Sequence, residues 1–219
     1  MSNSQPMRVM LGAGGHAAVL LDILHRYRQS LSLLVAAAST EIREIFRDVP
    51  IVDDATFMQM YAPKAVVLIN GVGMLPRSPL REQLYTAYRA RGYRFDSVIA
   101  PDAIISPYAH LHDGVQILPG AIVQAGASIG QNSIVNTRAV IEHDCAIGDH
   151  NHVAPGAILC GGCVSGNHVF IGAGATVIHN LTLGEQAVIG AGAVVTKAIP
   201  ARSVVYSYPP RLRASLQDM

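Results

Sequence analysis

The sequence of 219 residues contains no tryptophan, and only 14% of its residues are charged. The net charge is +1, so the chain lacks the excess of basic residues that binds nucleic acid. There is no uncharged apolar run long enough for a membrane span, and the first ten residues lack the pattern of a signal peptide. Three cysteines, an odd number, do not suggest a secreted disulfide framework. We therefore expect a cytoplasmic protein.

The sequence instead contains a six-residue repeat that runs without a phase slip from Ala103 to Ala198. In blocks it reads AIISPY, AHLHDG, VQILPG, AIVQAG, ASIGQN, SIVNTR, AVIEHD, CAIGDH, NHVAPG, AILCGG, CVSGNH, VFIGAG, ATVIHN, LTLGEQ, AVIGAG and AVVTKA. The third place is Ile, Leu or Val in 15 of 16 blocks, Ser165 being the exception, and the first place is Ala in 9. A fixed period of this kind indicates a repeat architecture.

A six-residue repeat with an aliphatic residue at the same place of each block predicts a parallel β-helix. The chain must bend between short strands to turn one side chain inward every six residues, and three bends close a triangular coil. Residues 18 apart then stack, and parallel strands pair coil upon coil at about 4.8 Å. Glycines at the fourth place, such as Gly130 and Gly148, are expected at bends because they lack a Cβ atom. We expect this domain to cover residues 101–219, with a C-terminal tail.

The first 100 residues show apolar strands that alternate with helices. Strands are expected at 7–12, 31–38, 48–52 and 65–71, and helices at 17–28, 55–61 and 80–92. Asp53 or Asp54 should cap the second helix, while Ser78 and Pro79 should cap and open the third, which Gly92 ends. The alternation predicts a small Rossmann-like α/β domain with a parallel sheet over residues 1–100.

A glycine-rich turn, GAGGHA (12–17), joins the first strand to the first helix. At such a junction, backbone N–H groups and the positive end of the helix dipole face any anion placed there. The dinucleotide fingerprint needs a third glycine, where this chain has Ala17, and an acid after the second strand, which ends in alanines, so NAD binding is disfavoured. Two interpretations remain open: a tight turn only, or a phosphate site of a nucleotide-linked compound, to which His16 could hydrogen-bond.

A second candidate site lies on the β-helix, where His143 and Asp144 should point away from the core. Asn136 lies one block earlier, and His152 lies on a neighbouring face. A histidine beside a carboxylate is the minimal general-base unit, because the acid fixes the ring tautomer while the other nitrogen faces the substrate. Imidazole titrates near neutral pH, which suits removing a proton from an attacking amine or hydroxyl. From spacing alone, a solvated histidine without a role is the alternative.

Metal and thiol chemistry are less well supported by the sequence. His143 and His179 are two coils apart, as in β-helices of the carbonic anhydrase type, but the third histidine expected five residues later is Gly184. Because catalytic zinc needs three protein ligands, we expect no metal. Cys145 and Cys163, both at the inward first place, are expected to be inert core thiols.

Together, GAGGHA, the hexads and VIEHDCAIGDHNHVAPGA (140–157) resemble the hexapeptide-repeat sugar acetyltransferases of the sialic acid O-acetyltransferase (NeuD-like) group. This group includes the N-acetyltransferases of nucleotide-linked bacillosamine and perosamine. The resemblance covers nearly the whole chain, and NTRAVIEHDC (136–145) is its most specific part. It implies a homotrimer of left-handed β-helices, with acetyl-CoA in the groove between neighbouring helices and a nucleotide-linked sugar on the N-terminal domain.

The activity that the resemblance implies is acetyl-CoA-dependent N-acetylation of a nucleotide-linked amino sugar in surface-polysaccharide or glycan biosynthesis. A sialic acid-type sugar O-acetyltransferase is the first alternative. A non-catalytic sugar-nucleotide-binding or scaffold protein that keeps the β-helix is an alternative from another class.

The resemblance also implies a role for each candidate residue. His143 matches the general base and Asp144 the acid that supports it. The residues that match contacts with acetyl-CoA are His152 near the thioester, Gly161 with its N–H at the acetyl carbonyl, and Ala173 and Ala191 along the pantetheine arm. Gly14, Gly15 and His16 match the loop around the nucleotide diphosphate. Asn136, one block before His143, is also expected to bind the substrate.

The chain departs from its relatives in three places. Alanines stand where relatives that bind UDP-sugars often carry acids, so the resemblance does not fix which nucleotide base is bound. The loop GVGMLPRSPLR (71–81) is longer than in some relatives, which concerns the sugar pocket. Residues Tyr206 to Arg211 replace a Val-Gly-Val-Pro-Ala turn, which concerns the far end of the CoA groove.

Overall fold

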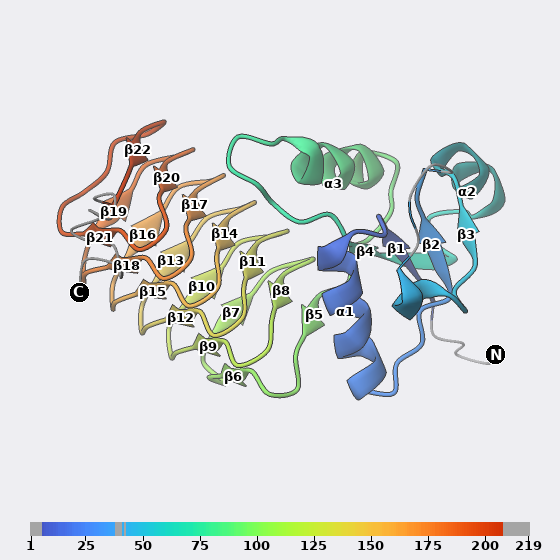
Figure 1. Cartoon of the computed structure of the whole chain (residues 1–219), viewed down its shortest axis with the longest axis horizontal. Helices are drawn as coiled ribbons and strands as arrows, with labels where there is room; N and C mark the ends of the chain where they lie inside the picture. The colour runs from blue at the N-terminus through green and yellow to red at the C-terminus, as the bar shows by residue number, and fades with distance from the viewer. Residues whose placement is uncertain (1–5, 38–40, 42, 208–219) are drawn as a thin grey trace, which may run out of the picture.

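The computed structural model describes residues 6–37, 41 and 43–207. Figure 1 shows an α/β domain beside a prism of stacked coils. Ala38 and Ser39 at the end of the second predicted strand, and Tyr208 to Arg211 of the altered C-terminal turn, lie outside the described residues. None of the described helices is long and apolar enough to cross a bilayer.

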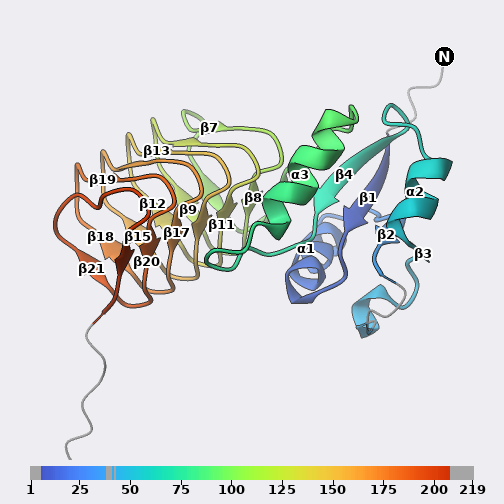
Figure 2. The ribbon, with the colours of Figure 1, turned by 90° about the horizontal axis from the view of Figure 1, so that it is seen from above.

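The α/β domain is built on a parallel sheet, as the sequence predicted. Its strands are β1 (Met7–Leu11), β2 (Leu33–Val35), β3 (Ile51–Val52) and β4 (Val66–Asn70), in the order β3-β2-β1-β4. The connecting helices are α1 (Gly15–Arg26), α2 (Asp54–Met60) and α3 (Leu80–Ala90), with a short 3-10 helix, η1 (Glu44–Phe46). Figure 2 shows α1 and α3 between the sheet and the prism, where their apolar sides are covered.

Two of the predicted helix ends are confirmed and one is wrong. The Asp53 carboxylate caps α2 by accepting a hydrogen bond from the Thr56 N–H at 2.9 Å. Gly92, with φ +88°, follows the end of α3 in the left-handed conformation that suits glycine. At the start of α3, however, Pro79 itself occupies the N-cap, and no side chain caps the helix, so the expected Ser78 cap is not made. The first N–H groups of α3 therefore lack a side-chain acceptor.

The prism has three faces of two-residue parallel strands (Figure 1). Face 1 consists of β5 (Val98–Ile99), β8 (Gln116–Ile117), β11 (Ile134–Val135), β14 (His152–Val153), β17 (Phe170–Ile171), β20 (Val188–Ile189) and β22 (Val204–Val205). Face 2 consists of β6 (Ile104–Ile105), β9 (Ile122–Val123), β12 (Val140–Ile141), β15 (Ile158–Leu159), β18 (Thr176–Val177) and β21 (Val194–Val195). Face 3 consists of β7 (His110–Leu111), β10 (Ser128–Ile129), β13 (Ala146–Ile147), β16 (Val164–Ser165) and β19 (Thr182–Leu183). The turns after each face form edge 1–2, edge 2–3 and edge 3–1.

The register is the one that the hexads predict. Val140 pairs with Ile122 and Ile158, each 18 residues away, and the third-place residues fill the core as stacked aliphatic side chains. The fourth-place glycines serve close stacking, because a Cβ atom on Gly148 would lie 2.5 Å from the carbonyl oxygen of Gly166 in the next coil. Positive φ angles occur instead at the sixth place, for example 58° at Asp144.

The inward cysteines are part of the core, as expected. The Cys145 thiol donates to the carbonyl of Cys160 at 3.3 Å, and the Cys163 thiol donates to the carbonyl of Ile178 at 3.1 Å. Burial raises the pKa of Cys145 to about 11. Both thiols are therefore poor nucleophiles at neutral pH.

The first coil begins at β5, just before the boundary expected at residue 101. A buried arginine of α3 joins the two parts of the chain. Arg81 is only 3% exposed and donates to the carbonyls of Asn70 and Val72 at the end of β4, and to the carbonyl of Asn132 on the prism. The carboxyl end of the α/β sheet is thereby held against the early coils.

Candidate active site

The first candidate side chains lie on edge 2–3, in the turn between β12 and β13. His143 and Asp144 are both mostly exposed, and His143 Nδ1 lies 2.9 Å from Asp144 Oδ2. Because an ionised carboxylate only accepts, Nδ1 carries the proton of the neutral ring and Nε2 presents a lone pair to the outside. A pair arranged in this way has the chemistry that a general base with an orienting acid requires.

Gly161 lies directly against the ring of His143. A Cβ atom at residue 161 would be 2.5 Å from both Cε1 and Nε2 of His143, so any side chain would displace the imidazole. The Gly161 N–H makes no hydrogen bond to any residue that the structure describes. It is therefore available to an oxyanion that forms beside Nε2.

His152 lies on face 1 and is nearly buried. The Asn136 side-chain oxygen accepts from the Thr137 N–H, so the Asn136 amide group faces the His152 ring and donates to Nε2 at 2.9 Å. Nδ1 then donates to the carbonyl of Met74 at 2.9 Å. Both ring nitrogens are used within the chain, so His152 is placed to orient Asn136 and the Met74 loop. A hydrogen bond to the thioester would require breaking one of these contacts.

The glycine-rich turn places the start of α1 at the carboxyl end of the sheet. Gly14 is the N-cap without a side-chain hydrogen bond, and a Cβ atom there would meet nothing within 4 Å. Arg43 approaches the same place, because its Nη2 would lie 3.7 Å from a Cβ atom on Gly15. An open helix N-terminus beside a guanidinium suits an anion. The sequence pattern gave no sign of Arg43, since the loop before η1 shows no periodicity.

His16 makes a different contact from the one expected. Gln116 donates through Nε2 to the carbonyl of Asn70 at 2.8 Å, so its side-chain oxygen accepts from His16 Nε2 at 2.6 Å. Nδ1 of the neutral ring then offers only a lone pair, and burial, the largest cause, lowers the His16 pKa to about 4. The expected hydrogen bond from His16 to a phosphate is therefore not supported, because the ring has no proton to donate there. It can accept from a ligand hydroxyl.

The two buried histidines should make stability depend on pH. Burial is the main cause that lowers the pKa of both His16 and His152 from 6.5 to about 4. Below about pH 6.5 these histidines become protonated in the unfolded chain, whereas in the folded chain they stay neutral until the pH falls to about 4. The free energy of unfolding should therefore fall over this window as pH decreases, by up to roughly 3 kcal/mol per histidine.

Urea unfolding at about pH 7.5, 5.5 and 4.5 measures this dependence. His152→Gln serves as the comparison, because glutamine can replace both hydrogen bonds but does not titrate. A His152→Gln protein with the pH dependence of the wild type would contradict the assignment for His152.

Within one chain, the candidate residues fall into separate groups. His143, Asp144 and Gly161 share edge 2–3. Edge 1–2 carries Asn136 and the exposed Ala173 and Ala191, which are 18 residues apart. Gly14, Gly15 and His16 lie in the α/β domain, which His16 joins to face 1 through Gln116. Across residues 6–37, 41 and 43–207, no three His, Cys, Asp or Glu side chains are grouped so as to hold a metal ion.

Comparisons with known proteins identify relatives of the whole chain. The family model "Bacterial transferase hexapeptide (six repeats)" matches residues 126–161 and 162–197. PerB from Caulobacter crescentus, solved with CoA and GDP-perosamine, is 30% identical with a TM-score of 0.83, and the match covers 98% of this chain and 100% of that chain. The acetyltransferase domain of PglB from Neisseria gonorrhoeae FA1090, solved with acetyl coenzyme A, is 27% identical with a TM-score of 0.84, covering 93% and 97%. No curated protein sequence matches the chain.

The coiled prism and its hexapeptide-repeat match define an acyltransferase of the left-handed β-helix, hexapeptide-repeat class. With 30% identity over the whole length of PerB, the chain belongs to the hexapeptide-repeat sugar acetyltransferases. The fold, the acyltransferase activity and the use of CoA implied by the sequence resemblance are thereby confirmed.

Proposed function

We propose that the protein transfers the acetyl group of acetyl-CoA to the amino group of a nucleotide-linked amino sugar. The observation that carries the proposal is the His143–Asp144 pair held against Gly161, whose N–H has no acceptor among the described residues. A base and an oxyanion donor side by side are what direct acyl transfer needs. The GDP-perosamine and CoA bound to PerB support a nucleotide-linked amino sugar as acceptor and a CoA thioester as donor.

The proposed reaction is a single displacement through a tetrahedral intermediate. The acceptor amine attacks the thioester carbonyl carbon, and His143 Nε2 takes the proton that the nitrogen loses. Asp144 stabilises the imidazolium, and the Gly161 N–H stabilises the oxyanion. Collapse of the intermediate breaks the C–S bond, and the proton held by His143 passes to the thiolate of CoA. No acyl-enzyme is needed.

The proposed ligand positions follow from where the chain is open. The exposed Ala173 and Ala191 leave a smooth line along edge 1–2 for the pantetheine arm. Gly14, Gly15 and Arg43 would hold the diphosphate of the acceptor. His16 would accept from an acceptor hydroxyl, and His152 would hold Asn136 in place beside the sugar.

A homotrimer is part of this proposal. The second-place residues of face 2 form a column of six paired positions, apolar except for Thr176, namely Ile104, Ile122, Val140, Ile158, Thr176 and Val194. Ile104 and Val194 are 65% and 66% exposed, so the column has no partner among the described residues of this chain. Such a face marks a protein interface. Three copies packed through face 2 would place edge 2–3 of one chain beside edge 1–2 of the next.

We also place the reaction in the cytoplasm. Cys145, Cys160 and Cys163 are all free thiols, as is usual in a reducing compartment.

Incubation with acetyl-CoA and a panel of 4-amino sugar nucleotides, with a thiol reagent present, tests the proposed function. We expect thiol release that depends on one acceptor, and a product whose added acetyl group resists hydroxylamine, as an amide does. A hydroxylamine-labile product would indicate an O-acetyltransferase. Release of no thiol with any acceptor would favour a non-catalytic binding protein.

A further inference from the structure

A cavity of about 420 Å³ lies between the Met74–Glu82 segment and face 1 of the prism. Its apolar wall is formed by Phe170, Val188 and Val204, which follow one another along face 1. Its polar wall is edge 3–1, with His150, His168, Gln186 and Arg202. This volume is typical of sites for small molecules. The cavity lining does not include the proposed reaction's residues on edge 2–3 (His143, Asp144 and Gly161) or those of the glycine-rich turn.

One end of the cavity is the start of α3. Ser78, Pro79, Arg81 and Glu82 line it there, and α3 has no side-chain cap. The first N–H groups of the helix and the positive end of its dipole are thus left to another acceptor. Arg77 adds a guanidinium to the same wall.

The buried Arg81 points to the same ligand chemistry. Its Nη2 has no hydrogen-bond partner, and no carboxylate of the described residues lies within 4.0 Å of the guanidinium. Burial lowers the Arg81 pKa to about 9, so the group is still charged at neutral pH. A buried charge without a counter-ion is costly, and an anion in the cavity would offset that cost.

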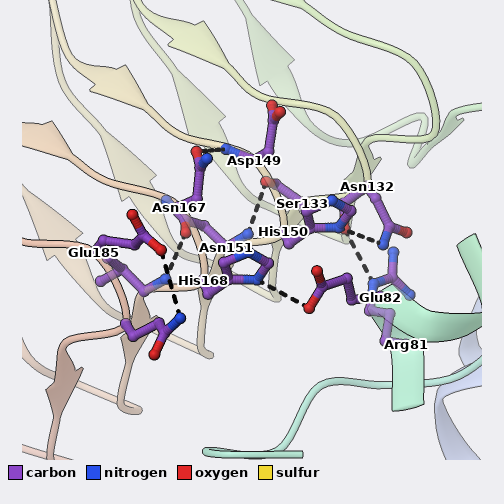
Figure 3. Close-up of polar contacts among 12 residues, drawn as sticks. Arg81, Glu82, Asn132, Ser133, Asp149, His150, Asn151, Asn167, His168 and Glu185 are labelled. Carbon is purple, nitrogen blue, oxygen red and sulfur yellow. Dashed lines mark hydrogen bonds and ion pairs between the residues drawn. The ribbon is translucent and has the colours of Figure 1, made fainter. Parts of the chain in front are cut away.

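The carboxylate in the cavity wall is already engaged. Figure 3 shows Glu82 of α3 directed at His168, whose Nδ1 lies 3.4 Å from the carboxylate oxygen. The His168 ring stacks in parallel on His150 at 5.1 Å, and His150 in turn bonds the Asn132 side chain (Figure 3). The cavity is thus lined by three arginines, Arg77, Arg81 and Arg202, and by one carboxylate, that of Glu82. This excess of positive charge favours a negatively charged ligand.

We propose that this cavity is a second ligand site that binds an organic anion of metabolite size. The anionic group, a phosphate or a carboxylate, lies at the start of α3 near Arg77 and Arg81. The apolar body of the ligand packs against Phe170, Val188 and Val204. Met74 lines the cavity and also holds His152 through its carbonyl, so occupancy is coupled to the residues that orient Asn136.

Calorimetric titration with phenyl phosphate, phenylacetate and benzyl alcohol tests this proposal on the wild-type protein. We expect saturable binding of at least one anion and none of the alcohol. The tighter of phenyl phosphate and phenylacetate identifies the anionic group. Arg77→Gln and Val188→Glu should each weaken that binding about tenfold or more, because they remove a cation or add an anion. Arg91→Gln, an exposed change at the other end of α3, should leave it unchanged.

Three outcomes would overturn the proposal. Equal binding of benzyl alcohol would show an apolar cavity without anion recognition. Absence of saturable binding by either anion would remove the site. Displacement of the bound anion by acetyl-CoA or by a nucleoside diphosphate, one for one, would make the cavity part of the catalytic ligand sites. These results do not depend on whether the acetyl transfer proposed above is found.

Discussion

Replacement of His143 by asparagine is expected to lower kcat by about 10²–10⁴-fold, the usual contribution of a positioned general base. The amide cannot take a proton from the attacking nitrogen, and the outward nitrogen of His143 lies against Gly161, since a Cβ atom there would be 2.5 Å from Nε2. Because the side chain is exposed, the substitution should leave the fold intact. Steady-state kinetics with acetyl-CoA and the accepted sugar nucleotide measures the effect, and KM should change little.

Gly161→Ala provides a second test of the same geometry. The added methyl group must push the His143 ring away, so kcat should fall although the base itself is present. Gly92→Ala is a matched control, because it introduces strain at φ +88° in the α/β domain, far from the ring. It should cost about 1 kcal/mol of stability and leave kcat unchanged. A His143→Asn enzyme with nearly normal turnover would refute the assignment of the base.

Ile158→Lys is expected to convert the proposed trimer to monomers and to reduce activity by more than about 100-fold. The substitution places a charge in the middle of the apolar column on face 2, where its burial would be unfavourable. Val164→Lys is the matched control, because Val164 is 44% exposed on face 3 while Ile158 is 37% exposed on face 2. Sedimentation equilibrium distinguishes the 23.2 kDa chain from a species of three times that mass. Loss of the trimer in both variants, or in neither, would contradict the choice of face.

Mixed trimers test whether neighbouring chains share each site. His143→Asn removes the base, and Gly14→Val fills the open start of α1 with a side chain whose Cβ atom meets nothing within 4 Å. Each variant alone should be inactive. If each site combines edge 2–3 of one chain with the acceptor site of the next, an equal mixture should recover about a quarter of wild-type activity after random reassembly. No recovery would place the whole site within one chain.

The hexads were sufficient to predict the prism and its register, because the core contains one aliphatic residue from each block. Ser165, the exception, is buried and accepts from the Asn151 amide, so a polar pair replaces the aliphatic residue there. The fourth-place glycines were identified correctly but for the wrong reason. Their importance lies in the close approach of the next coil, which no single coil reveals.

The candidate site was predictable where its chemistry is local. His143 and Asp144 are neighbours in sequence, so their hydrogen bond follows from the turn. The roles of His16 and His152 were not predictable, because they depend on Gln116 and Met74, which are 100 and 78 residues away. Arg81 was also missed, since only the docking of α3 on the prism buries it.

The inward direction of Cys145 has a chemical consequence for an enzyme that handles thioesters. A thiolate within reach of acetyl-CoA would intercept the acetyl group by trans-thioesterification and divert it from the sugar. Cys145 follows His143 by only two residues, yet its sulfur faces the opposite way, is protonated at neutral pH and is hydrogen-bonded to a carbonyl. The alternation of side chains along the coil thus turns the Cys145 thiol away from the surface that carries His143.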